Sequence, residues 1–145
     1  MHIVRSLHQR LQGYFDCYVE SDLEFEMRHI ARPERSVLGD DTTEMALKYL
    51  ALVLLTAIDQ RAEKLIIARW ASRLLGGKEC LLATPRNSIV DRAITIVKEI
   101  TGADSDTPLR ELALGLGNDR LTLDVEHRIV ANEEEVLFGL GSLRN

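Results

Sequence analysis

The sequence predicts a mainly α fold: a helical bundle around one long central helix over about residues 42–75, with a possible small β element near residues 120–130. The main observation is that residues 45–58 are apolar on every side of a helix, because Lys48 and Thr56 are the only polar residues among them. A helix that is apolar all round must be buried. Helical spacing of apolar residues before and after this segment supplies the helices that we expect to bury it.

The N-terminal part begins with a predicted helix at about residues 3–19, where apolar side chains recur every three or four positions. Its basic start is also compatible with a targeting segment, but the periodicity continues to Val19, which favours a helix of the bundle. Residues 22–31 alternate as in a strand and are also spaced as in a helix, so both structures stay open. Pro33 ends this element in either case.

The long helix is expected to begin at the acidic residues 40–44, where Asp41 and Glu44 have the spacing of a capping box, and to end at Gly76-Gly77. At 1.5 Å per residue it would be roughly 46 Å long. A rod of this length is difficult for one small chain to cover, so we expect a homodimer in which a second copy supplies part of the cover.

Two Thr-Pro pairs, at residues 84–85 and 107–108, each place a capping hydroxyl before a proline in the first turn, which is typical of a helix start. Asn132, which precedes three glutamates, also predicts a helix start. We interpret the two Gly-Leu-Gly sequences as helix ends rather than phosphate loops, because neither follows a strand and opens a helix. The helices predicted in this way cover residues 85–101, 109–114 and 133–138.

Residues 120–130 alternate between apolar and polar side chains, which predicts a strand with His127 on its apolar face. A strand needs a partner to satisfy its backbone groups. The candidates for this partner are residues 22–30 and residues 80–83.

Composition limits the class of protein. The 145 residues fit a single domain over residues 1–145, and the formal net charge of −5 argues against nucleic acid as a partner. Cys17 and Cys80 are too few for a disulfide framework, so we expect a reducing, cytoplasmic location. Residues 45–58 are fewer than the roughly 20 apolar residues that a membrane span needs, so we expect no membrane partner. No motif calls for a cofactor.

A candidate metal site is formed by Glu26 and His29, which would share one face of a helix as in the carboxylate-bridged di-iron bundles. Such a site needs a second Glu-x-x-His. The nearest copy is Asp124 to His127, and a strand would place those two side chains on opposite faces. The alternative is a surface glutamate beside a half-buried histidine.

Candidate ligand-binding residues are Arg28, Arg61 and Arg69, since guanidinium groups bind phosphate and carboxylate. Arg28 belongs to a basic cluster with Arg32 and Arg35. Pairing of this cluster with nearby acidic residues in a solvated loop is the alternative.

From Ile58 to Ile100 the chain is similar to the small all-helical chorismate mutases, in which an arginine on a long helix precedes a loop and a second helix opened by Pro and Arg-Glu. Arg61 stands in the first position and Pro85-Arg86 in the last. The chain departs from the pattern at Asn87, which follows Arg86 in place of glutamate, and at Ser72-Arg73 near the position of the family's lysine. The resemblance implies an all-helical enzyme.

Trp70 is the only tryptophan, and it suits either core packing or an interface anchor. Because no catalytic motif is present, our first hypothesis is a non-catalytic cytoplasmic protein that acts through protein–protein contacts as an adaptor, regulator or accessory subunit. The alternative is a small all-helical enzyme or ligand-binding protein with an Arg/Glu/His pocket between helices.

Overall fold

The computed structural model describes residues 6–30, 40–69, 72–76, 80–82 and 85–140, which form a mixed α/β fold. The mainly α helical bundle expected from the sequence is therefore wrong. Helices and strands follow one another in the order α1 (Leu7–Tyr18), α2 (Leu23–Ile30), α3 (Asp40–Asp59), β1 (Lys64–Ala68), β2 (Ser72–Leu75), β3 (Cys80–Leu82), α4 (Asn87–Thr101), β4 (Leu109–Leu116), β5 (Asp119–Val130) and β6 (Glu133–Gly139).

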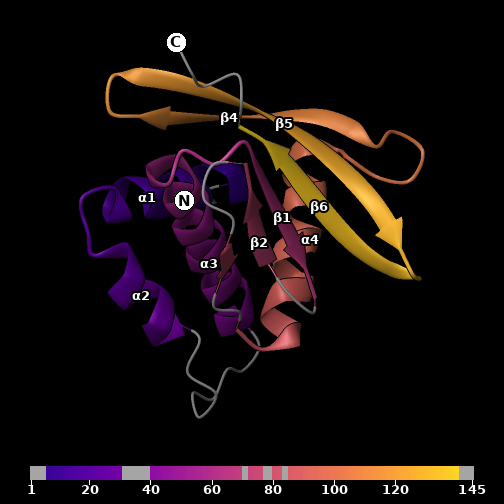
Figure 1. Cartoon of the computed structure of the whole chain (residues 1–145), viewed down its shortest axis with the longest axis horizontal. Helices are drawn as coiled ribbons and strands as arrows, with labels where there is room; N and C mark the ends of the chain where they lie inside the picture. Colours follow the sequence, from indigo (N-terminus) through magenta and orange to yellow (C-terminus); the bar gives the residue numbers. More distant parts are fainter. Residues whose placement is uncertain (1–5, 31–39, 70–71, 77–79, 83–84, 141–145) are drawn as a thin grey trace, which may run out of the picture.

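The strands form one antiparallel sheet with the order β3-β2-β1-β6-β5-β4. Two meanders of three strands each, separated by α4, meet where β1 pairs with β6 in the register Leu65 to Phe138 and Ile67 to Val136. The sheet twists strongly and curves over the helices, so that β4 and β5 cross the top of the molecule while β1 and β2 run down its front (Figure 1).

The N-terminal helices begin at well-formed caps. Ser6 and Gln9 form a capping box at the start of α1, with each side chain bonded to the other residue's backbone N–H. The Asp22 carboxylate accepts a hydrogen bond of 3.0 Å from the backbone N–H of Phe25 at the start of α2. In the described part of the segment, residues 22–30, the cap is followed by helix and not by a strand, which resolves the ambiguity there.

The central helix α3 ends at Asp59, well before the predicted end near residue 75. Arg61 has a φ of 55°, which turns the chain out of the helix, and Lys64–Ala68 continues as a strand. Two adjacent isoleucines, Ile66 and Ile67, are β-branched and favour a strand once neighbours are available for pairing. The rod of roughly 46 Å that the sequence predicted is therefore a shorter helix followed by β1 and β2.

Two further predicted helices are strands. Residues 109–114 lie in β4 and residues 133–138 lie in β6, and each pairs with β5 along its length. The segment taken for a lone strand, residues 120–130, is confirmed as β5, with β4 and β6 as its neighbours in place of the expected partners. The helix predicted at 85–101 is confirmed as α4, and Gly102 ends it with a φ of 80° and a hydrogen bond to the carbonyl of Lys98.

The apolar helix α3 is buried within its own chain. It packs against α1, α2 and α4 and against β1, and its residues 45–55 and 57 are buried except for Lys48. At its centre the hydroxyl of the fully buried Tyr49 shares a hydrogen bond with Ser72 on β2. In the described part of the chain, no helix combines the length and the apolar character that crossing a membrane requires.

Candidate functional site

The hairpin of β5 and β6 extends beyond the rest of the sheet. β4 pairs with residues 119–126 of β5, and the last contact on this side is a 2.8 Å hydrogen bond from the His127 N–H to the carbonyl of Pro108. Beyond it, β5 pairs with β6 alone. Backbone groups alternate in direction along a strand, so the N–H and C=O of Ile129 point to the same side as those of His127. No strand of the described residues lies on that side of Ile129.

The end of this hairpin exposes two large apolar side chains. Ile129 is 58% exposed and Val130 is 53% exposed. Neighbouring side chains of a strand point to opposite faces, so the hairpin end is apolar on both faces. Single exposed apolar residues are ordinary, but two of them on an unpaired strand edge form a surface on which another chain can pair. We call residues 128–132 the hairpin tip.

A two-residue turn fixes the register of the tip. Ala131 and Asn132 have φ values of 52° and 67°, and they connect the paired residues Val130 and Glu133. Two positive φ values are the signature of a type I′ turn, whose twist matches that of the flanking strands. Asn132 therefore belongs to a hairpin turn and does not cap a helix.

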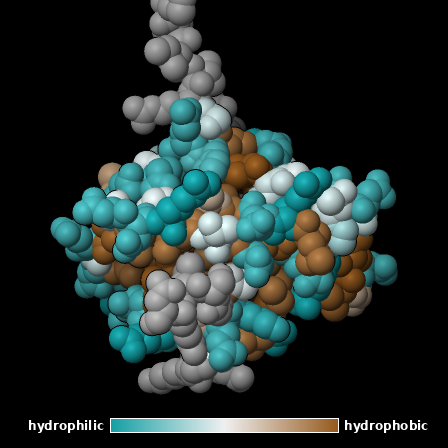
Figure 2. Space-filling model, turned by 90° about the horizontal axis from the view of Figure 1, so that it is seen from above, coloured by the Kyte–Doolittle hydropathy of each residue, from teal (hydrophilic) through white to brown (hydrophobic). Residues whose placement is uncertain are grey.

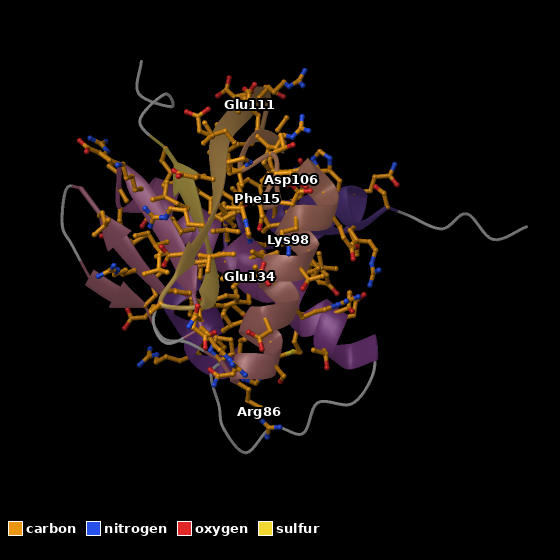
Figure 3. The ribbon with its side chains drawn as sticks, turned by 90° about the vertical axis from the view of Figure 1, so that its right-hand side faces the viewer. Phe15, Arg86, Lys98, Asp106, Glu111 and Glu134 are labelled. Atoms are coloured by element: carbon orange, nitrogen blue, oxygen red, sulfur yellow. The ribbon has the colours of Figure 1, made fainter. Side chains whose placement is uncertain are left out.

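One polar cluster attaches the hairpin to α4. Glu134 Oε2 lies 2.8 Å from Lys98 Nζ and 2.8 Å from Nε2 of the buried His127. Lys98 on α4 and Glu134 on β6 lie beside each other in Figure 3. Hydrogen bonds from Lys98 and His127 lower the pKa of the Glu134 carboxyl, although its partial burial acts in the opposite direction. The charged carboxylate is thus the form that holds hairpin and helix together.

A second cluster lies closer to the tip. Arg69, which follows β1, places its guanidinium nitrogens 3.5 Å from Asp91 on α4 and 3.9 Å from Glu133 on β6. Its Nε atom is buried without a hydrogen-bond partner among the described residues. Together the two clusters bind the hairpin to α4 and β1, so we expect the tip to be presented in a fixed orientation.

A third polar cluster joins α1 to α3. Glu44 accepts hydrogen bonds from Arg10 and from the Tyr14 hydroxyl, and the ammonium group of Lys48 lies 5.7 Å from the centre of the Tyr14 ring. Burial and the neighbouring Glu44 raise the pKa of Tyr14 to about 12. Burial alone would raise the pKa of Glu44, but its hydrogen bonds to Tyr14 and Arg10 lower it. The cluster therefore consists of a neutral phenol hydrogen-bonded to the Arg10–Glu44 ion pair, and its role is to hold α1 against α3.

The structure separates the arginines proposed as ligand-binding residues. Arg61 precedes β1 and Arg69 follows it, so the two residues lie at opposite ends of that strand. Arg28 lies on α2, where its side chain is 69% exposed and reaches Glu24 at 3.9 Å. It lines a cavity of about 720 Å³ between α2, the end of α3 and β3. Arg61 and Arg69 do not line this cavity. Arg32 and Arg35 lie outside the described residues.

The metal hypothesis gains no support from the geometry. Glu26 and His29 lie on α2, and His29 is exposed with its ring stacked on Phe25 at 6.3 Å. The second pair divides between the two faces of β5, since His127 is buried while Asp124 is exposed. Among the described residues, no group of three or more His, Cys, Asp and Glu side chains is arranged to hold a metal ion.

The all-helical architecture implied by the resemblance to chorismate mutases is absent. Residues 58–100 contain the end of α3, three strands and most of α4. Trp70, the proposed interface anchor, lies outside the described residues. The all-helical enzyme is therefore excluded as an alternative.

Sequence reasoning missed the hairpin tip. The signal was present, because Ile129 and Val130 are consecutive apolar residues at the end of an alternating segment and the Ala-Asn pair follows directly. Asn is typical of type I′ turns, but three glutamates after Asn132 favoured a helix start. The cavity beside α2 could not be foreseen, because its walls come from segments that are distant in sequence.

Comparison with known proteins adds no further assignment. No protein-family model and no curated protein sequence matches this chain.

Proposed function

We propose that this protein acts through protein–protein contacts, as a non-catalytic adaptor, regulator or accessory subunit, and that it forms a homodimer through the hairpin tip. The observation that carries the proposal is the unpaired edge of β5 at Ile129, flanked by exposed apolar side chains on both faces of the hairpin. Addition of a strand to such an edge is a general mode of protein recognition.

A second copy is a suitable partner for geometric reasons. Two identical edges can pair antiparallel about a two-fold axis, which gives a closed, self-complementary interface. With Ile129 opposite its own copy, the two residues exchange both backbone hydrogen bonds, and Arg128 lies opposite Val130 on the outer face. This register keeps like charges apart, whereas a register centred on Arg128 would place two guanidinium groups opposite each other.

The central helix α3 does not provide the dimer interface. The apolar residues of α3 are covered by α1, α2, α4 and β1 of the same chain, so they do not require a second protomer. The proposed interface lies instead at the edge of the sheet, where the β5–β6 hairpin extends beyond β4. The surface seen from above has hydrophobic patches separated by hydrophilic side chains, which suits a local contact better than a broad one (Figure 2).

A cytoplasmic location is part of the proposal. Cys17 is a free, exposed cysteine. An exposed thiol is maintained most readily in a reducing compartment.

The test is the oligomeric state of the purified chain as a function of concentration. The contact buries parts of four aliphatic side chains and adds two hydrogen bonds, so we expect a dissociation constant on the order of 10 µM. Native mass spectrometry and light scattering should detect the dimer at concentrations above this value.

The matched variants are Ile129→Thr/Val130→Thr, which keeps the β-branched shape, and Val19→Thr, which makes the same exchange at an exposed valine on the opposite part of the molecule. The first should weaken the dimer at least about tenfold, and the second should leave it unchanged. A wild-type chain that stays monomeric at a concentration 100-fold above the expected dissociation constant would refute self-association.

A further inference from the structure

The cavity of about 720 Å³ beside α2 has the size of a small-molecule site. It is lined by the turn between α1 and α2, the first turns of α2, the C-terminal turn of α3 and Leu82 of β3. Figure 1 shows two of the lining elements, α2 and α3, which run in opposite directions on the left of the molecule. The hairpin tip does not contribute to it, so the cavity is independent of the proposed dimer contact.

One part of the cavity wall is apolar. Met27 is buried, Leu23 and Leu82 are partly buried, and all three line the cavity and pack against the main core. A ligand that enters would bury its own hydrocarbon against these side chains, and the hydrophobic effect would favour this burial.

The charged part of the wall is predominantly negative. Among the described residues, three carboxylates line the cavity, those of Asp22, Glu24 and Asp59, against one guanidinium, that of Arg28. Arg28 reaches Glu24 alone among the residues that the structure describes, at 3.9 Å, and its side chain is largely exposed to solvent. The Asp22 carboxylate caps α2 through one of its two oxygens. The cavity therefore has an excess of negative charge.

Asp59 adds negative charge that no basic side chain in the last turn of its own helix neutralises. It is the last residue of α3, and the last turn of that helix contains no basic side chain. The C-terminus of a helix carries partial negative charge, which favours cations and disfavours a carboxylate at this position. Asp59 forms no ion pair with any described residue. Helix end and carboxylate thus create a negative potential next to an apolar wall.

We propose that this cavity binds an organic cation with an apolar body, such as an alkylammonium group, with the charge at Asp59 and the hydrocarbon against Met27 and Leu23. An inorganic cation would leave the apolar wall unused, and an anion would meet the excess of carboxylates. The same chemistry occurs in a free amine and in a lysine side chain of a peptide.

The test is to titrate the full chain with hexyltrimethylammonium, tetramethylammonium or hexanoate. Calorimetry and amide chemical shifts measure the binding of each probe. We expect hexyltrimethylammonium to bind at least about tenfold more tightly than either of the others, with shifts in α2 and the end of α3. Equal binding of the three probes, or no binding of hexyltrimethylammonium at millimolar concentration, would overturn the proposal.

Two aspartate variants locate the charge. Asp59→Asn removes the carboxylate without changing its shape and relieves its repulsion with the helix end, so the chain should remain folded. It should weaken hexyltrimethylammonium binding about fivefold, whereas Asp119→Asn, in the distant β4–β5 hairpin, should leave binding unchanged. Equal affinity of wild type and Asp59→Asn would contradict the assigned position of the charge and with it the proposal.

Butylammonium and the capped tripeptide acetyl-Leu-Lys-Leu-amide distinguish the two sources of the cation. Tighter binding of the tripeptide identifies a peptide side chain as the ligand, and tighter binding of butylammonium identifies a free amine. Either order supports a cation site. Failure of both amines to displace hexyltrimethylammonium would refute it.

Discussion

Glu44 illustrates how single residues connect the elements of this fold. It lies near the start of α3, where its spacing from Asp41 predicts a capping box. In the structure its two carboxylate oxygens accept hydrogen bonds from Arg10 and Tyr14 of α1. Glu134 has a similar role between β6 and α4. Both carboxyls have a lowered pKa in the folded chain, so both link stability to pH.

The sign of this linkage follows from the direction of the shift. A carboxyl whose pKa is lower in the folded state than its ordinary value of 4.5 contributes stability above that value. The contribution disappears as the pH falls through the folded-state pKa. We therefore expect the free energy of unfolding, measured by urea titration, to decrease from pH 6 toward pH 3.

Glu44→Gln tests this residue-scale prediction. It should lower the free energy of unfolding at pH 7 by about 0.5–1 kcal/mol, a modest value because the side chain is partly exposed and screened by solvent, and should reduce the dependence on pH. Glu111→Gln, at an exposed position of β4, provides the control and should change neither quantity. An unaltered pH profile in the Glu44 variant would show that the ion pair does not stabilise the folded chain.

At the scale of elements, local signals in the sequence identified the segments that carry their own caps or a clear period. α1, α4 and β5 were predicted within a few residues, and α4 ends at Thr101, the predicted last residue. The end of α3 was missed, because no glycine or proline marks Asp59. The strands β4 and β6 were missed because their structure depends on pairing with β5, which a local reading of caps cannot detect.

The hairpin turn of β5 and β6 gives a second prediction. Ala131 has a φ of 52°, a conformation that is unfavourable for residues with a β-carbon. Ala131→Gly should relieve this strain and raise the free energy of unfolding by about 0.5–1 kcal/mol, as measured by chemical denaturation. The reverse exchange, Gly117→Ala in the β4–β5 turn, where φ is 61°, should lower it. If Ala131→Gly were destabilising, the type I′ turn would be wrong.

At the scale of the whole molecule, the sheet has two functions: its inner face completes the core around α3, and its overhanging hairpin carries the proposed contact surface. The candidate site was only partly predictable. Arg28 lies in the cavity wall and Arg69 supports the hairpin, yet neither role was predicted. Asp91 and Glu133, which pair with Arg69, and Asp59, which lines the same cavity as Arg28, come from distant parts of the chain. Contacts between distant parts of the chain therefore determine those features of the site that could not be predicted from local sequence patterns.

Disulfide cross-linking at the hairpin tip tests the proposed dimer most directly. In an antiparallel, hydrogen-bonded pair the two Cα atoms lie about 5.5 Å apart, a distance that a disulfide can span. In a background of Cys17→Ser and Cys80→Ser, Ile129→Cys should form a covalent dimer under mild oxidation, while Val19→Cys in the same background should remain monomeric. Failure of Ile129→Cys to cross-link, or equal cross-linking by both variants, would contradict pairing through the edge of β5.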